Sequence, residues 1–269
     1  MSVLGVGVIT YERRGLLEQL FASLAELTES PHELVVADDG SRDGTVEWCR
    51  DRGLRVVSGV RRGVAWNKNR ALFALAHLGC DPLVLLEDDA YPVVHGWERD
   101  WIEGTRRWHH LGYHHAKVAK HTVSGTGTPA DPFVNPAATA QCLSVSAEVV
   151  VKVGFFDPRF RGWGHEHAEW TTRIKTAGYG FRRITLPDGR RPEAQLYLTG
   201  GLGGGDASSF RDEDQVRANL EVGNRIAGEP VFRRPWRTPE ERASFLAEQA
   251  EAGIDGAGLA AQLDAYDPA

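Results

Sequence analysis

The sequence has no apolar run near the ~20 residues that a helix needs to cross a bilayer, so we expect no membrane span. Its first residues, MSVLGVGVITYERR, carry no basic segment ahead of the apolar stretch and do not resemble a secretory signal. Cysteine is scarce, with Cys49, Cys80 and Cys142 standing at unpaired spacings. This pattern argues against a disulfide framework or a zinc knuckle. It favours a reducing cytoplasm and predicts three small buried residues.

An excess of basic charge is also absent. The formal net charge of −6 makes the chain as a whole a poor partner for nucleic acid or an anionic membrane, although a locally basic pocket is compatible with it. The apolar fraction of 42% and the charged fraction of 25% are typical of a globular protein. The sequence contains no internal repeat and no clean linker, so we expect one domain with a helical C-terminal extension.

Short β-branched segments alternate with amphipathic segments through the first half of the chain. The expected strands are residues 3–9, 33–41, 54–59 and 83–86, and the expected helices are residues 15–27, 43–53 and 63–79. Alternation at this spacing requires crossover connections. It therefore predicts an α/β fold with a mostly parallel sheet that is flanked by helices.

Polar residues follow three of the four expected strands. The first strand runs into TYERR, the second into DDGS and the fourth into EDD. Ligands of parallel sheets bind at the carboxyl ends of the strands, so these groups should gather at one edge. The acidic triplet Glu87, Asp88 and Asp89 suits Mg²⁺ or Mn²⁺, which take one or two protein carboxylates and fill the remaining positions with water and phosphate oxygens. The alternative is a solvated turn capped by acids.

The second half of the chain is less regular. Its expected elements are a strand followed by a helix from Ser146, a helix over 164–180 that ends at Gly178 or Gly180, and helical stretches at 211–227, 239–252 and 256–265. The histidine-rich segment 109–121 has one i, i+4 histidine pair but a glycine inside it, which favours surface residues over a metal cluster. The segment GGLGGGD, residues 200–206, is expected to be too flexible for regular structure, and is either a lid or a plain connection.

Five segments, taken in order, resemble the GT-A nucleotide-sugar-dependent glycosyltransferases of family two. They are VGVITYERRGLLEQLFASL, ELVVADDGSRDGT, RRGVAWNKNRAL, VLLEDDAYP and VGFFDPRFRGWGHEHAEWTTRIKTAGY, and together they span about residues 3–182. The resemblance implies a GT-A (Rossmann-like) domain over residues 1–205. Residues 1–95 would form its nucleotide-sugar half and residues 96–205 its acceptor half. Residues 206–269 would be a helical extension packed on the same domain.

The resemblance also implies an activity, which is transfer of a sugar from a nucleoside-diphosphate sugar, with UDP favoured, to an acceptor hydroxyl. Most members of the family invert the anomeric centre, and a bound Mn²⁺ or Mg²⁺ stabilises the leaving diphosphate. The acceptor, the sugar and the oligomeric state stay open. Three other functions are compatible with the residues: a sugar-1-phosphate nucleotidyltransferase, a glycosidase with paired carboxylates, and a binding module without catalysis.

Residue roles follow from the matched motifs. The nucleotide-binding residues implied are Thr10, Tyr11, Glu12, Arg13, Asp38, Asp39, Lys68, Glu87 and Asp88. Among them Asp39 is favoured over Asp38 for accepting the base N–H, and Glu87 or Asp88 would hold the ribose. Asp89 would bind the metal. Asp206 would replace the C-terminal histidine ligand that some GT-A enzymes supply.

The acceptor side departs from the family pattern. The family carries an aspartate in G-E-D, whereas this chain reads G-H-E-H, with Glu166 and His167 at the last two positions. Either residue can accept a proton near neutral pH, and Glu166 is slightly favoured as the catalytic base. Trp163 and His165 are the expected acceptor-binding residues. The alternative is that His165 and His167 are ordinary polar residues at the start of a helix.

Overall fold

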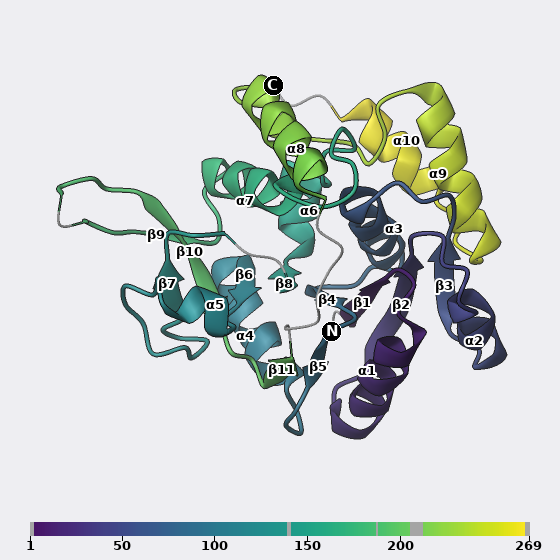
Figure 1. Ribbon diagram of the computed structural model, residues 1–269, viewed down its shortest axis with the longest axis horizontal. Helices are drawn as coiled ribbons and strands as arrows, with labels where there is room; N and C mark the ends of the chain where they lie inside the picture. Colours follow the sequence, from purple (N-terminus) through teal and green to yellow (C-terminus); the bar gives the residue numbers. More distant parts are fainter. Residues whose placement is uncertain (1–2, 139–140, 187, 205–211, 267–269) are drawn as a thin grey trace.

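The computed structural model describes residues 3–138, 141–186, 188–204 and 212–266. A nine-stranded mixed sheet crosses the molecule, with helices on both faces (Figure 1). The spatial order of its strands is β3 (Arg55–Ser58), β2 (His32–Asp38), β1 (Leu4–Thr10), β4 (Leu83–Glu87), β8 (Cys142–Val145), β6 (His110–Tyr113), β10 (Glu193–Leu198) and β7 (Phe133–Asn135), with β9 (Phe181–Arg183) also paired to β10. The predicted α/β class, with a sheet flanked by helices, is confirmed.

The described helices form two layers around this sheet. They are α1 (Arg14–Leu27), α2 (Thr45–Asp51), α3 (Val64–His77), α4 (Glu98–Trp108), α5 (Ala116–Ala119), α6 (Ala147–Val153), α7 (Glu166–Thr176), α8 (Glu213–Ile226), α9 (Pro239–Glu251) and α10 (Ala257–Ala265). Successive residues of a strand face opposite layers, so Val84 packs in one core and Leu85 in the other. This two-sided burial explains why the strands read as continuous apolar runs.

The first four strands align their carboxyl ends. β3, β2, β1 and β4 are parallel, and the register pairs Thr10 with Asp38, Asp38 with Ser58, and Ile9 with Glu87. The polar residues that follow these strands therefore gather at one edge, as the alternation predicts. β8 then runs antiparallel to β4 and β6, which makes the second half of the sheet mixed.

The glycine-rich segment corrects one expectation. Residues Leu202–Gly204 form β11, which pairs antiparallel with β5 (Ala90–Pro92), directly after the acidic triplet. Gly204 has a φ of +85°, and a Cβ there would lie 2.1 Å from the Asp89 carbonyl oxygen. These glycines thus permit a close approach to the acidic motif. The flexibility expected of them was wrong for residues 202–204.

The helical stretches expected near the C-terminus are confirmed as α8, α9 and α10. α9 packs against α3, where Glu248 accepts hydrogen bonds from Arg70 and from the Trp66 indole. The three cysteines are free and buried, as expected. No helix among the described residues combines the length and apolarity that a bilayer span requires.

Candidate active site

Asp88 is held by the last residue of β1 and by the loop that follows this strand. Thr10 Oγ1 donates to Asp88 Oδ2 at 2.9 Å, and the Arg13 guanidinium forms an ion pair with Asp88 Oδ1 at 3.1 Å. Burial raises the pKa of Asp88 to about 6, against the charge of Arg13, which lowers it. The structure therefore joins three of the predicted nucleotide-binding residues and leaves each Asp88 oxygen with a partner inside the protein.

Glu87 forms an ion pair with Lys68, a buried lysine of α3. Lys68 lies on α3 and is fully buried, and its Nζ donates to Glu87 Oε1 at 2.9 Å. The side chain of Glu87 is 25% exposed, so solvent still reaches part of it. The motif match places Lys68 near the base or phosphate, whereas the contact in the structure is with the acidic triplet.

Within the acidic triplet, Asp89 is the acid with a buried oxygen that has no hydrogen-bond donor in the described part of the chain. Its side chain is only 7% exposed, and Oδ1 is buried with no hydrogen-bond partner among the described residues. Burial, and then the neighbouring charge of Glu87, raise the pKa of Asp89 to about 6. A buried carboxylate oxygen without a donor is costly, and a bound cation would remove that cost.

The acidic triplet fits a divalent cation with few protein ligands. The described residues contain no group of three or more histidine, cysteine or acidic side chains arranged to hold a metal on their own. Asp89, completed by water and diphosphate oxygens, matches the donor set that Mn²⁺ or Mg²⁺ accepts. Asp206, the second ligand expected from the sequence, lies outside the described residues.

The DDGS turn keeps both of its aspartates buried. Asp38 Oδ2 accepts hydrogen bonds from the backbone N–H groups of Gly40 and Ser41 and from the Ser58 hydroxyl, so Asp38 shapes the turn. Asp39 accepts from the backbone N–H groups of Arg62 and Gly63 and pairs with Arg70 at 3.1 Å. Among the described residues Asp39 Oδ2 accepts only the Gly63 N–H, so this oxygen has capacity for one further donor.

Two loop contacts were not foreseen from the sequence. Arg61 lies with its guanidinium carbon 4.2 Å from the centroid of the Tyr11 ring. Glu12 accepts a hydrogen bond from the backbone N–H of Arg42 and donates its own backbone N–H to the Ser41 hydroxyl. Glu12 thus links the loop after β1 to the loop after β2. Arg61 adds a second contact to the loop after β1 through Tyr11. The sequence signal available for the Arg61 contact was the pair of adjacent arginines, Arg61 and Arg62, in the segment RRG.

Glu166 lies at the start of α7 and is almost fully buried, at 4% exposure. Its Oε2 accepts the Gly164 backbone N–H at 2.8 Å. Burial raises the pKa of Glu166, the charge of Lys68 lowers it, and the charge of Glu87 raises it. These couplings bring Glu166 into one electrostatic group with the acidic triplet, and a raised carboxylate pKa suits a general base near neutral pH.

His167 faces a different set of neighbours. The Thr171 hydroxyl lies 3.4 Å from His167 Nε2, and the ring centroid is 6.3 Å from that of His110. His110 is fully buried, and burial lowers its pKa to about 4. The surface interpretation of the histidine-rich segment was therefore wrong for His110, which sits in β6 where the sheet and α7 cover it.

The acceptor-side segment touches the start of α3 at Gly63 and Val64. The Val64 N–H donates to the Gly162 carbonyl at 2.8 Å, and a Cβ on Gly63 would lie 2.2 Å from the Gly162 nitrogen. Trp163 is half-buried, and its carbonyl accepts from Asn219 on α8. His165 is half-buried with a φ of +67°. Trp163 and His165 thus lie between Glu166 and Gly162, which contacts Gly63, whose backbone N–H donates to Asp39.

Residues 5–94 match the sequence model described as glycosyl transferase family 2. A search of curated proteins finds no match. Solved structures with a similar fold include GalNAc-T7 with UDP, GalNAc and Mn²⁺, at a TM-score of 0.60 and 13% identity, covering 94% of this chain and 51% of that one. This chain therefore spans about half the length of GalNAc-T7.

Two prokaryotic enzymes share the fold as well. The mannosyltransferase of Pyrobaculum calidifontis with GDP-Man and Mn²⁺ aligns at a TM-score of 0.52 and 19% identity, over 98% of this chain and 76% of that one. Glucosyl-3-phosphoglycerate synthase of Mycobacterium tuberculosis with Mn²⁺, UDP and phosphoglyceric acid aligns at a TM-score of 0.52 and 19% identity, over 82% of this chain and 78% of that one. At such identities the likeness establishes the fold.

Proposed function

We propose that this chain, a glycosyltransferase by its family 2 match over residues 5–94 and by its GT-A fold, performs metal-dependent transfer from a nucleoside-diphosphate sugar to an acceptor hydroxyl. UDP is the favoured nucleotide and inversion the favoured outcome. Two of the three structural neighbours above contain UDP, and the third contains GDP-Man. A reducing, cytoplasmic setting remains part of the proposal, supported by the three free cysteines.

The observation that carries the proposal is the buried Asp89 oxygen without a donor at the carboxyl edge of the sheet. Asp89 would hold Mn²⁺ or Mg²⁺, and the bound cation would supply charge stabilisation for the leaving diphosphate. Arg13 pairs with Asp88 and Lys68 pairs with Glu87, so the charges of these two neighbouring acids have partners inside the protein. Glu87, whose side chain is 25% exposed, would accept a hydrogen bond from a ribose hydroxyl.

Glu166 is assigned the role of base. As the acceptor oxygen bonds to the anomeric carbon, its proton passes to a Glu166 carboxylate oxygen, and the anomeric carbon–oxygen bond to the diphosphate breaks with its electron pair leaving on the diphosphate. Burial raises the pKa of Glu166, and the positive charge of Lys68 acts against this effect and favours the carboxylate form that the step needs. His167, which faces Thr171 and His110, is assigned to positioning of α7.

A thermal-shift panel tests this function. UDP-, GDP- and dTDP-sugars are added with and without Mn²⁺, since a ligand that binds only the native state raises the melting temperature with occupancy. The expected result is one diphosphate sugar, based on UDP, that stabilises the protein strongly only with Mn²⁺. A panel in which no nucleotide-sugar shifts the melting temperature, with or without metal, contradicts the proposal.

A further inference from the structure

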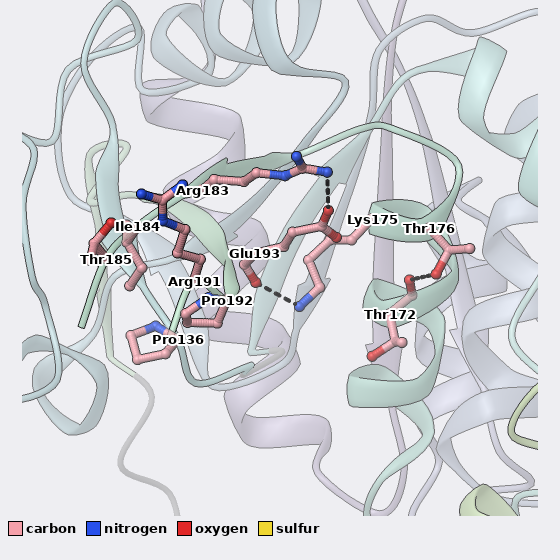
Figure 2. Close-up of a pocket in the computed structure, with 10 residues that line it drawn as sticks. All are labelled: Pro136, Thr172, Lys175, Thr176, Arg183, Ile184, Thr185, Arg191, Pro192 and Glu193. Carbon is pink, nitrogen blue, oxygen red and sulfur yellow. Dashed lines mark hydrogen bonds and ion pairs between the residues drawn. The ribbon is translucent and has the colours of Figure 1, made fainter. Parts of the chain in front are cut away.

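A cavity of about 750 Å³ lies between α7 and the β9–β10 hairpin, outside the residues assigned above (Figure 2). Helix α7 contributes one wall and the hairpin the other, and Pro136 lines it as well. The full lining is Pro136, Thr172, Lys175, Thr176, Arg183, Ile184, Thr185, Arg191, Pro192 and Glu193. Three of these side chains are cationic and one is acidic, so the lining has a positive formal charge in a chain of net charge −6.

The cations of this cavity are only partly neutralised. Arg183 pairs with Glu193 at a long 3.4 Å, and Lys175 donates to the backbone carbonyl of Glu193 without forming a direct ion pair with a described carboxylate (Figure 2). Arg191 is exposed and has neither a hydrogen bond nor an ion pair with any other described residue. Like charges repel unless an anion joins them, so the lining is electrostatically suited to an anionic ligand.

Two short stretches of the chain connect the lining of the cavity to the site at the sheet edge, and they limit the distance between the two places. Thr172 lies six positions after Glu166 on α7, which is about 9 Å along the helix axis. Pro136 lies five positions before Gln141, which limits their separation to about 18 Å. The carbonyl of Gln141 accepts the Glu87 backbone N–H at 2.9 Å. The cavity is therefore within reach of one extended ligand whose other end is at Glu166.

The accessible face of α7 connects the two places. His165, Ala168, Thr172 and Lys175 recur at helical spacing, and each is half-buried or exposed, whereas Glu166, His167 and Trp170 are buried. From His165 to Lys175 this stripe is about 15 Å long. An acceptor that places its hydroxyl at Glu166 and its charged group in the cavity is therefore longer than a monosaccharide.

We propose that the cavity between α7 and the β9–β10 hairpin is the acceptor's anion subsite, which binds a phosphate or carboxylate group of an extended acceptor through Arg183, Arg191 and Lys175. This inference rests on the proposed function, because it names the acceptor class of that reaction. It defines the acceptor as an anionic saccharide or saccharide conjugate. The hydroxyl that reacts and the group that is recognised lie on separate units of it.

Titration calorimetry at fixed ionic strength tests the subsite with three probes, glucose 6-phosphate, glucuronate and methyl glucoside. The expected result is saturable binding of at least one anionic probe and none of the neutral one. The anionic probe that binds shows whether the recognised group is a phosphate or a carboxylate. Arg191→Gln and Arg183→Gln are each expected to weaken that binding by about fivefold or more, because each removes a charge-assisted contact.

Arg190→Gln is the matched control, because Arg190 is the exposed neighbour of Arg191 but pairs with Asp188 and does not line the cavity. We expect it to change probe affinity by less than about twofold. Equal losses from Arg190→Gln and Arg191→Gln, or no probe binding at all, would overturn the subsite. Binding of a UDP-sugar with Mn²⁺ is measured on the same proteins. If it persists while the probes fail, the proposed function stands without the subsite. If the wild-type protein binds no nucleotide-sugar, the proposed function itself fails.

Discussion

Lys68 Nζ lies 2.9 Å from Glu87 Oε1, and this ion pair joins a fully buried lysine of α3 to the first acid of the site. Burial removes the lysine from water, and the ion pair with Glu87 offsets part of this desolvation cost. The same lysine lowers the pKa of Glu166. One buried cation therefore serves both the metal-side acids and the proposed base.

Lys68→Met is expected to destabilise the protein, because it leaves Glu87 without its partner inside a partly desolvated site. The free energy of unfolding should fall by about 2 kcal/mol, less than for a fully buried pair because Glu87 retains some solvent contact. Urea unfolding measures the loss. The double variant Lys68→Met/Glu87→Gln should recover part of it, and strictly additive losses would show that the two charges do not interact.

Glu166→Gln is expected to lower kcat by about 10²- to 10⁴-fold while leaving donor affinity unchanged, because it removes the proposed proton acceptor and none of the proposed nucleotide-binding residues. The release of nucleoside diphosphate with Mn²⁺, against an acceptor panel, measures kcat. His167→Gln serves as the comparison and should cost less than about tenfold. A larger loss in His167→Gln than in Glu166→Gln would exchange the two roles.

The sequence predicts the first half of the fold well, and local physics explains why. The apolar runs of β1, β2 and β4 and the amphipathic stripe of α1 are patterns of neighbouring residues, so they are visible before folding. The strands β5 and β11 are not, because they depend on a pairing between segments about a hundred residues apart. His110 likewise became buried only because α7 covers β6.

Some features of the candidate site could likewise be predicted from the sequence, and others could not. The acidic triplet is conspicuous as a run of charges after a strand, and the structure places it at the expected edge. Which acid is already paired inside the protein could not be predicted, because the partners Arg13 and Lys68 come from other segments. The link between Asp39, Arg70 and Glu248 spans most of the chain and has no local sequence signature.

Glu248→Gln tests whether the C-terminal helices belong to the same folding unit as the sheet. Glu248 accepts from two nitrogens of Arg70 and from the Trp66 indole, and loss of its charge leaves a buried arginine undercompensated. The free energy of unfolding should fall by about 3 kcal/mol, in one cooperative transition seen alike by tryptophan fluorescence and circular dichroism. Glu251→Gln, on the exposed face of the same helix, should have little effect. Two separate transitions in the wild-type protein would instead indicate an independent C-terminal unit.

His110 gives the stability a defined dependence on pH. Its folded-state pKa of about 4 lies below the ordinary value of 6.5 because the neutral ring is buried. Between these values the unfolded chain binds the proton and the folded protein does not, so the contribution of His110 to stability falls as pH decreases from 6.5 to about 4, by up to about 1.4 kcal/mol per pH unit.

The raised pKa values of Asp88 and Asp89 act in the opposite sense over much of this range, so the His110 effect is measured as a difference. The free energy of unfolding of wild-type protein minus that of His110→Asn should decrease as the pH is lowered from 6.5 towards 4. A difference that is constant across this range would show that His110 titrates normally in the folded protein.

Mn²⁺-dependent binding of UDP, measured by titration calorimetry on wild-type protein and on Asp89→Asn, tests the central claim most directly. Asp51→Asn, an exposed aspartate at the end of α2, is the matched control. The account predicts that Mn²⁺ strengthens UDP binding at least tenfold in the wild type and the control. It predicts that this gain disappears in Asp89→Asn, because the amide cannot supply the anionic ligand that the cation requires. An Asp89→Asn protein that keeps the full Mn²⁺-dependent gain would contradict the assignment of the metal to this edge of the sheet.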